Sequence, residues 1–571
     1  MGRLFRSRAE ISHALVVVGA ALTVGAYWPV TGYAQVPTGA QPGVIERPVA
    51  RPPTTIEEQK QEIPSLAPKP ESVTNPEQVV ATFKSIAFKG NTVVGTGSLD
   101  KIAAKYLNRP MTRGDLAQLK YEVAKAYYDD GYILVQVVTP QQDVAAGVLN
   151  VEIYEAKVGT ITVNNDNILR QHVVDGLSSR VQPGDVFREQ PVESMVNDFS
   201  DLTNVDAALN LRQGQQFGTT DMLLNLARSD EDQQRVSADN YGSKATGRYN
   251  AASVNLQKSN FFKMGEKLNL DGFFTNELTY GGAGTVSLPT GLQNIFFEGR
   301  YIYSHISLGD DLEGLDAHGR TDIWEIALSK KFINMRSMVV AARGGFQSRT
   351  HQTYTFHELS NRDDIRQLFV EGSYLARFSG FLGYASLRVA RGIDVMGASH
   401  LGDINATRIQ GDPEATLLQP LLYATYQPIP KGELKGQISG QYATRTALAS
   451  DLFILCGYSS VRGFEPAQAT GESGVQASLE YDHTVWQGPW QGFNWTAAAG
   501  PFIDAGHVWN RVEPAQTTDP TLVAAGIGGQ VETDVLRVGK TKLRVDIAFP
   551  IGSYSNTVGT MMTYFRLTQG F

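Results

Sequence analysis

Cysteine is almost absent from this chain of 571 residues, since Cys456 is the only one. A single thiol excludes a disulfide framework and any metal site built from clustered cysteines. Charge is also scarce: Asp, Glu, Lys and Arg make up 19% of the residues, against about 25% in average soluble domains. The formal net charge of -8 argues against nucleic acid as a partner, because a nucleic-acid-binding domain carries a basic stripe.

Long apolar runs are missing from most of the chain, and the exception lies at the N-terminus. Three arginines within residues 1–8 precede the apolar stretch 14–30, and Gly32-Tyr33-Ala34 supplies small residues at the two positions that a signal peptidase reads. Residues 1–34 are therefore predicted to be a secretory signal peptide, with an N-terminal membrane anchor as the alternative. An exported chain without another apolar run of about 20 residues can still span a membrane as a closed β-barrel.

Residues 35–78 are rich in Pro and Gln, which predicts an extended linker. Within it, residues 56–63 are a candidate for a short helix that plugs a pore, and plain disorder is the alternative reading.

Two stretches then repeat one order of elements. Residues 79–157 read as strand, helix, helix, strand, strand, and residues 158–229 repeat that order. One helix in each carries a single apolar face, formed by Leu116, Leu119, Val123, Ala124 and Tyr127 in the first stretch and by Val192, Met195, Val196, Phe199 and Leu202 in the second. The pattern predicts two consecutive α+β modules, and a single α+β domain is the alternative.

From residue 234 onward the helical period gives way to alternation with a period of two. In the stretch 543–549, for example, Leu, Val, Ile and Phe alternate with Arg, Asp and Ala. A soluble antiparallel sheet shows the same alternation. Four observations favour a membrane barrel instead. The segments are about ten residues long, their apolar faces end in Tyr or Phe, their opposite faces are charged, and an export signal precedes them.

Sixteen such segments can be counted, an even number as single-chain bacterial barrels require. They are predicted to start near Val236, Gly247, Gly265, Gly284, Gln293, Asp322, Ser337, Ile365, Gly380, Ala415, Glu433, Val475, Phe493, Leu522, Thr541 and Gly559. A barrel of this size has a lumen that its own wall side chains do not fill, so another segment is expected to occupy it.

The long connection 445–474 is the candidate for that segment, because loops of this length are usually either functional or disordered. It contains Val461-Arg462-Gly463-Phe464, where Gly lets the backbone turn sharply beside the guanidinium. In the following hairpin, alternation in Phe502-Ile503-Asp504-Ala505-Gly506 turns Asp504 toward the lumen. An Arg462–Asp504 pair would hold the loop inside the barrel; the alternative is an exposed loop with an unpaired arginine.

These two motifs, followed by a C-terminal strand that ends in Phe571, resemble the outer-membrane assembly and secretion superfamily. The two α+β modules resemble its POTRA domains. Signal peptide, Pro/Gln-rich linker, two modules and sixteen strands together resemble the two-partner secretion transporters (TpsB), which include the haemolysin secretion/activation proteins.

The resemblance implies a role for each motif. Arg462 would be the loop-tip residue that contacts the inner wall, flanked by Val461, Gly463 and Phe464; Asp504 would be its partner, flanked by Phe502 and Gly506. Phe571 would be the signal read by the barrel-assembly machinery and would pack on outer-membrane lipid. The implied function is secretion of an unfolded partner exoprotein of β-helical type through the pore, with the POTRA modules in the periplasm. An assembly factor for other outer-membrane proteins and a passive porin remain as alternatives.

No enzyme and no cofactor are expected. The nine histidines are scattered without metal-ligand spacing. Gly539-Lys540-Thr541 resembles the end of a phosphate loop, but Asp534 stands where that loop needs its first glycine, so no nucleotide site is predicted.

Overall fold

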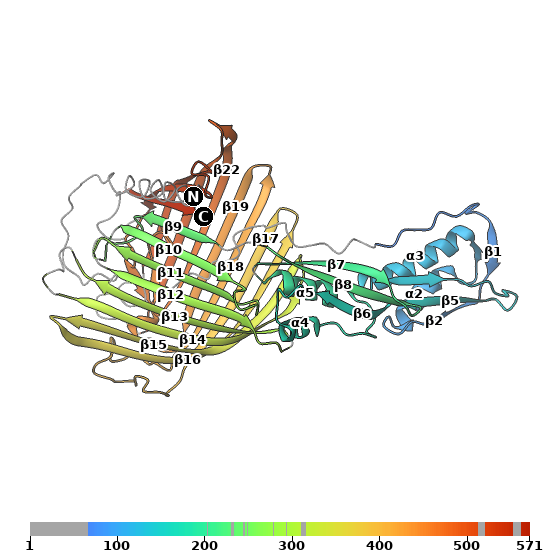
Figure 1. Ribbon diagram of the computed structural model, residues 1–571, viewed down its shortest axis with the longest axis horizontal. Helices are drawn as coiled ribbons and strands as arrows, with labels where there is room; N and C mark the ends of the chain where they lie inside the picture. The colour runs from blue at the N-terminus through green and yellow to red at the C-terminus, as the bar shows by residue number, and fades with distance from the viewer. Residues whose placement is uncertain are drawn as a thin grey trace, which may run out of the picture.

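The computed structural model describes residues 67–571 except 203, 230–232, 244–245, 248, 278, 293, 310–313, 315, 512–519 and 552–560. The predicted signal peptide, the candidate plug helix 56–63 and most of the predicted linker lie outside these residues. Figure 1 shows a large barrel on one side and two small α/β modules that extend from one end of it. In the part of the chain that is described, no helix is long and apolar enough to cross a bilayer.

Module 1, the one farther from the barrel, is a three-stranded sheet covered by helices. Strands β2 (Ser85–Lys89), β5 (Val148–Glu155) and β4 (Val135–Val138) form the sheet in the order β2-β5-β4, with β5 parallel to β2. Helices α2 (Thr96–Ala103) and α3 (Arg113–Asp129) pack on it, η2 (Ala104–Tyr106) follows α2, and the short strands β1 (Val79–Thr82) and β3 (Pro110–Thr112) pair separately.

The helix α3 begins at a capping box. The Thr112 hydroxyl accepts a hydrogen bond from the Asp115 backbone N–H, and the Asp115 carboxylate accepts one from the Thr112 backbone N–H. This reciprocal pair satisfies two N–H groups that the first turn of a helix leaves free. The apolar face of α3 carries Leu119, Val123 and Tyr127 into the core, as the spacing of the sequence predicts.

Module 2 repeats the arrangement next to the barrel. Strands β6 (Lys157–Asn164), β8 (Thr219–Arg228) and β7 (Val205–Gln213) form a sheet in the order β6-β8-β7, with α4 (Gln171–Ser178) and α5 (Glu189–Ser200) between β6 and β7 in the chain. The five apolar residues predicted on one helix face (Val192, Met195, Val196, Phe199 and Leu202) all lie in its core. The last strand of each module thus lies in the middle of its sheet, and the edges are β2 and β4 in module 1 and β6 and β7 in module 2.

Sixteen antiparallel strands close the barrel, which confirms the predicted fold class and strand number. They are β9 (Gln234–Asp239), β10 (Asn250–Ser259), β11 (Lys267–Thr275), β12 (Tyr280–Pro289), β13 (Ile295–Ser307), β14 (His318–Asn334), β15 (Met338–Thr355), β16 (Glu358–Phe378), β17 (Phe381–Gly392), β18 (Thr416–Ile429), β19 (Gly432–Ala443), β22 (Ser473–Trp490), β23 (Phe493–Trp509), β24 (Thr521–Thr533), β25 (Thr541–Ile551) and β26 (Met562–Gly570).

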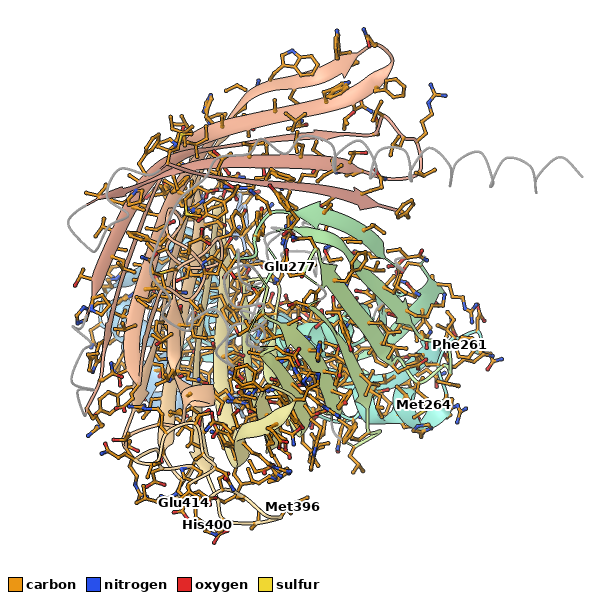
Figure 2. The ribbon with its side chains drawn as sticks, turned by 90° about the vertical axis from the view of Figure 1, so that its left-hand side faces the viewer. Phe261, Met264, Glu277, Met396, His400 and Glu414 are labelled. Atoms are coloured by element: carbon orange, nitrogen blue, oxygen red, sulfur yellow. The ribbon has the colours of Figure 1, made fainter. Side chains whose placement is uncertain are left out.

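The strand faces differ as the alternation predicts. In β14, Ile326 and Leu328 are exposed on the outer wall, whereas the intervening Ala327 and the neighbouring Glu325 are buried. The inner wall of β13–β17 carries ion pairs such as that of Arg388 with Glu325 at 3.0 Å. A barrel wall that is apolar outside and charged inside suits lipid on one side and a polar lumen on the other. The short turns lie at the end next to the modules; Figure 2 shows Met396, His400 and Glu414 on the long far-end loop that joins β17 to β18.

A buried polar contact attaches module 2 to the barrel. Asn334, at the end of β14, donates from its amide to Asp198 of α5 at 2.8 Å, and its backbone N–H donates to the Ser194 hydroxyl at 3.0 Å. Arg180 pairs with the same Asp198 carboxylate at 2.9 Å and donates to the Lys331 and Phe332 carbonyls. Burial raises the pKa of Asp198, although its contacts with Arg180 and Asn334 oppose that shift.

Candidate functional site

The connection between β19 and β22 turns into the barrel and has structure of its own. It contains the one-turn η4 (Ala449–Asp451) and the strands β20 (Phe453–Leu455) and β21 (Ala469–Gly471), which pair with each other as the base of the loop. Two residues of the base, Phe453 and Leu455, pack with Val508, Leu522 and Ala524 of the wall strands. The tip that carries the arginine motif, residues 456–468, is thereby held against the inside of β23 and β24.

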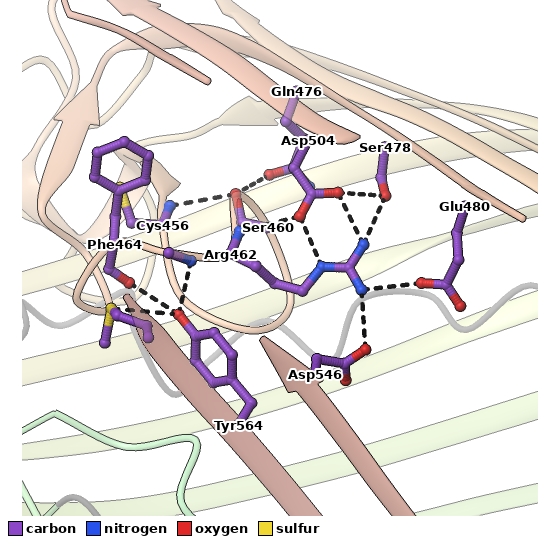
Figure 3. Close-up of polar contacts among 12 residues, drawn as sticks. Cys456, Ser460, Arg462, Phe464, Gln476, Ser478, Glu480, Asp504, Asp546 and Tyr564 are labelled. Atoms are coloured by element: carbon purple, nitrogen blue, oxygen red, sulfur yellow. Dashed lines mark hydrogen bonds and ion pairs between the residues drawn. The ribbon is translucent and has the colours of Figure 1, made fainter. Parts of the chain in front are cut away.

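Arg462 forms a bidentate ion pair with Asp504 of β23 (Figure 3). Its Nε donates to Asp504 Oδ2 at 2.7 Å and its Nη2 donates to Oδ1 at 2.9 Å, while the Arg462 backbone N–H donates to Oδ2 at 3.1 Å. Asp504 is fully buried and Arg462 is 5% exposed. Parallel donation to both oxygens fixes the orientation of the guanidinium as well as its charge.

Further wall residues complete the surroundings of the guanidinium. Arg462 Nη1 donates to Glu480 of β22 at 2.9 Å and lies 3.5 Å from Asp546 of β25. Arg544, also on β25, bonds both carboxylates, at 2.9 Å to Glu480 and 2.7 Å to Asp546. Two guanidinium groups therefore face three carboxylates, so the cluster carries one net negative charge when all five groups are ionised.

The next two residues of the motif are fixed by Tyr564 of β26. The Gly463 backbone N–H donates to the Tyr564 hydroxyl at 3.0 Å, and that hydroxyl donates to the Phe464 carbonyl at 3.3 Å. Gly463 has φ of +92°, a conformation that side chains disfavour. A β-carbon there would also lie 3.3 Å from the Ala524 β-carbon. Both the backbone conformation and the close contact therefore favour glycine at this position.

The residues around Asp504 shape the wall for the loop. The ring of Phe502 lies under the Arg462 guanidinium, with the guanidinium carbon 3.4 Å from the ring centroid. At Gly506, an added β-carbon would come within 2.8 Å of a Leu455 methyl and 3.1 Å of a Val461 methyl. Gly506 therefore leaves the space into which the loop packs.

A second contact holds the base of the loop to the opposite part of the wall. Asp451, buried in η4, accepts from Arg349 of β15 at 2.7 Å. The neighbouring Ser450 donates to Asp363 of β16 at 3.0 Å. The loop is thus bound at its base to β15 and β16 and at its tip to β22, β23 and β25.

Two residues that the sequence analysis singled out lie apart from the arginine cluster. Phe571 is 47% exposed, and its backbone N–H donates to the Gln234 carbonyl at 2.9 Å, next to the first barrel strand. Cys456 is buried in an apolar cluster with Val461 and Phe464 of the loop tip and Leu455 of its base. Among the described residues no group of acidic, histidine or cysteine side chains could hold a metal ion.

Sequence reasoning missed Glu480, Asp546, Arg544 and Tyr564 as partners of the motif. The alternation of their strands already indicates that Glu480, Arg544 and Asp546 face the lumen. Which lumenal residues meet the loop depends on strand register and on the depth that the loop tip reaches, and neither leaves a local signal in the sequence.

A sixteen-stranded barrel with two N-terminal α+β modules and an arginine loop docked in its lumen defines the class of POTRA-bearing outer-membrane transporters. The model of the family "Haemolysin secretion/activation protein ShlB/FhaC/HecB" matches residues 218–531, and that of the ShlB-type POTRA domain matches residues 81–156. The chain belongs to the haemolysin secretion/activation protein family. It is therefore an outer-membrane transporter rather than an enzyme, and its POTRA modules lie in the periplasm.

Relatives and solved structures agree with this assignment. The outer membrane transporter CdiB of Dickeya dadantii is 25% identical over 468 residues, 80% of each chain. The heme/hemopexin transporter protein HuxB of Haemophilus influenzae is 25% identical over 413 residues, 70% of this chain and 72% of its own. The structure of CdiB from Escherichia coli superposes with a TM-score of 0.75 at 19% identity, covering 89% of this chain and 93% of that one, which shows a shared fold.

Proposed function

We propose that the two POTRA modules capture an unfolded secreted exoprotein and that the barrel lumen conducts it outward without nucleotide. The exoprotein is expected to be a TpsA-like chain that becomes β-helical outside the cell. The buried Arg462–Asp504 pair carries the proposal, because it holds in the lumen a loop that has to move before a chain can pass. The proposal rests also on the family, whose members include transporters such as CdiB and HuxB.

Capture would use the edges of the POTRA sheets. An edge strand can bind an extended segment through backbone hydrogen bonds, and such pairing tolerates almost any sequence. Strand β7 suits this role because it is a sheet edge of nine residues and exposes Asp206, Asn210 and Arg212. The edge β4 in module 1 is shorter, with four residues.

The Arg462 loop would act as the gate. Charge-assisted hydrogen bonds hold the Arg462 guanidinium, which can exchange these polar partners for water or for an incoming chain. The energy for export would come from folding of the exoprotein outside the cell and from biased diffusion. The failure of the phosphate-loop pattern at Asp534 is consistent with that source.

The test is secretion of the cognate exoprotein by cells that carry R462A. The variant is expected to insert as a folded barrel, seen as heat-dependent migration in gels, and to secrete less exoprotein than the wild type. R511A is a matched control: Arg511 follows β23 and donates to the Ala443 carbonyl and the Tyr442 hydroxyl instead of to the cluster. Wild-type secretion by R462A would refute the gating role.

Capture is tested separately by photo-crosslinking. A photoreactive residue at Asn210, on the edge β7, is expected to crosslink to the exoprotein during export. The same residue at Lys125, on the exposed face of α3, is the control and should give little product. Equal crosslinking at both positions would argue against capture along the edge.

Two other functions make different predictions. If the protein inserted other outer-membrane proteins, its deletion would lower the amounts of many barrels. If it were a passive porin, removal of residues 79–229 would leave solute flux unchanged. If deletion of the protein and removal of residues 79–229 each stop the export of one exoprotein only, that result supports secretion.

A further inference from the structure

The outer wall of β12–β16 carries an ordered set of side chains beyond the apolar band. In an antiparallel pair, residues directly opposite each other lie on the same face. The register therefore defines rows that run across the strands, perpendicular to the strand direction. Ile326, Phe346 and Leu368 form one such row on the outer face, and Ile326 and Leu368 are exposed on it.

Successive rows toward the extracellular end become more polar. The row next to the aliphatic one consists of Tyr301, Trp324, Ser348 and Arg366. The following row consists of Tyr303, Asp322, Thr350 and Asp364. The outermost row of interest, here called the basic row, consists of Tyr280, His305, Arg320, Gln352 and Arg362.

Arg320 of the basic row stands at the height of the lipid headgroups. Trp324 and Tyr301 are aromatic residues at the edge of the aliphatic wall, where outer-membrane barrels place their girdle. Arg320 lies four residues beyond Trp324 on β14. At about 3.4 Å per residue and a strand tilt of about 40°, Arg320 stands roughly 10 Å above Trp324. That distance is outside the hydrocarbon and within the phosphate and sugar layer.

Positive side chains outnumber negative ones in the three rows beyond the aliphatic row. Arg320, Arg362 and Arg366 stand with Asp322 and Asp364, which leaves one net positive charge before either nearby imidazole is counted. The Arg320 side chain is 50% exposed and that of Arg362 is 46% exposed. Arg320 uses Nε for Asp322 at 2.9 Å, and its two terminal nitrogens have no hydrogen-bond partner among the described residues. They remain able to bind an anion from the membrane side.

Aromatic and imidazole rings line the same place. The rings of Tyr280, His305, His318 and Tyr354 follow one another across β12, β13, β14 and β15, with centroids 5.1, 5.6 and 4.8 Å apart. The Arg320 guanidinium lies 5.4 Å from the Tyr303 ring centroid. Flat rings beside a guanidinium offer a stacking surface for sugar rings next to a donor for phosphate.

The opposite wall has different residues at its extracellular end. An outward row of β22, β23 and β24 consists of Val475, His507 and Thr521, and the guanidinium of Arg511, just beyond β23, already donates to the Ala443 carbonyl and the Tyr442 hydroxyl. Strands β14, β15 and β16, which carry Arg320, Gln352 and Arg362 of the basic row, are 17, 18 and 21 residues long and project beyond the aliphatic band.

We infer that the basic row of β12–β16 binds a phosphorylated glycolipid of the outer leaflet, with Arg320 and Arg362 on a phosphate and the ring series against the sugars. The inference adds a lipid site to the outer wall and does not depend on the gate in the lumen. Such a site would fix the rotation and depth of the barrel in an asymmetric membrane, in which the glycolipid occupies the outer leaflet alone.

The test is lipid binding by the purified full-length protein in detergent micelles. The probes are diphosphoryl lipid A, monophosphoryl lipid A and phosphatidylglycerol, measured by native mass spectrometry. The wild type is expected to retain diphosphoryl lipid A over both others. The R320Q/R362Q double variant should bind it about tenfold or more weakly, the size expected for lost hydrogen bonds between charged groups.

Two further variants keep the test decisive. K330Q removes an outward cation from the same strand β14 near its periplasmic end, and it should bind diphosphoryl lipid A like the wild type. R320K/R362K keeps both charges and should retain most of the binding, which guards against a double glutamine variant that does not fold. Equal retention of phosphatidylglycerol by the wild type, unchanged binding by folded R320Q/R362Q, or an equal loss in K330Q would each overturn the inference.

Discussion

Arg462 and Asp504 lie 42 positions apart in the chain and meet through two parallel hydrogen bonds of 2.7 and 2.9 Å inside the barrel. The pair links a loop tip to a wall strand, and both partners are buried. Buried ion pairs are costly to break by removing one partner, by about 3–5 kcal/mol, because the other charge is left uncompensated. The relationship makes a stability prediction that is independent of secretion.

A double-mutant cycle of R462A and D504A should show coupling. R462A is expected to destabilise the folded protein more than D504A, because it leaves Asp504, Glu480 and Asp546 facing one another with Arg544 as their cation. The coupling free energy should fall within about 0.5–3 kcal/mol, as for residues in one ion-pair network. The measurement is denaturant unfolding in micelles, and strictly additive effects would show that the pair contributes no direct interaction.

Gly506→Ala should loosen the loop without breaking the barrel. The new methyl group would lie 2.8 Å from Leu455 and 3.1 Å from Val461, so the loop base has to shift. Overpacking of this kind costs about 1–3 kcal/mol. The expected result is faster proteolysis within residues 444–472. Gly529→Ala in β24 is the matched control, since its β-carbon would have ordinary contacts at 3.9 Å. In this variant residues 444–472 should be cleaved at the wild-type rate.

Asn334→Ala should weaken the attachment of module 2 to the barrel. The substitution removes the amide that bonds Asp198 and leaves that buried carboxylate with fewer donors. Faster hydrogen exchange in α5 is expected, with module 1 unchanged. Asn494→Ala removes an amide that bonds Asp534 in another periplasmic turn, so it is the control. If both variants exchange alike in α5, the Asn334 contact does not hold the module.

Module 1 should lose stability in acid through Glu155. Burial alone would raise the pKa of Glu155, but the hydrogen bonds from Thr92, Val93 and Tyr127 outweigh it and lower the pKa below its usual value. A carboxylate whose folded pKa is lowered contributes stability above its unfolded pKa of about 4.3. That contribution disappears as the pH falls further, through the folded pKa.

Hydrogen exchange of residues 79–157 in the full chain, corrected for intrinsic rates, measures this effect. Between neutral pH and about pH 4 the E155Q variant should be less protected than the wild type, and the difference should shrink in stronger acid. E152Q, whose carboxylate accepts from the exposed Tyr154 hydroxyl, is the control and should follow the wild type. A constant difference at every pH would mean that the charge of Glu155 is not the cause.

The barrel was predictable strand by strand because alternation is local. Several predicted starts lie within two residues of the observed ones, as for Val475 against Ser473 and Thr541 against Thr541, and the number sixteen is confirmed. The helix with a single apolar face in each module, α3 and α5, was also predicted. The small strands β1, β3, β20 and β21 were missed, because three or four residues are too few to show a period.

Sequence alone determined which side chains face lipid and which face the lumen, since that follows from parity along each strand. It also placed Arg462 on a long loop and Asp504 on an inward face. Tertiary structure decided that Glu480, Asp546 and Arg544 surround the same guanidinium and that Tyr564 fixes the next turn. It also aligned Arg320 with Arg362 in one outward row. These contacts depend on strand register and barrel closure, which bring together residues that are far apart in the chain.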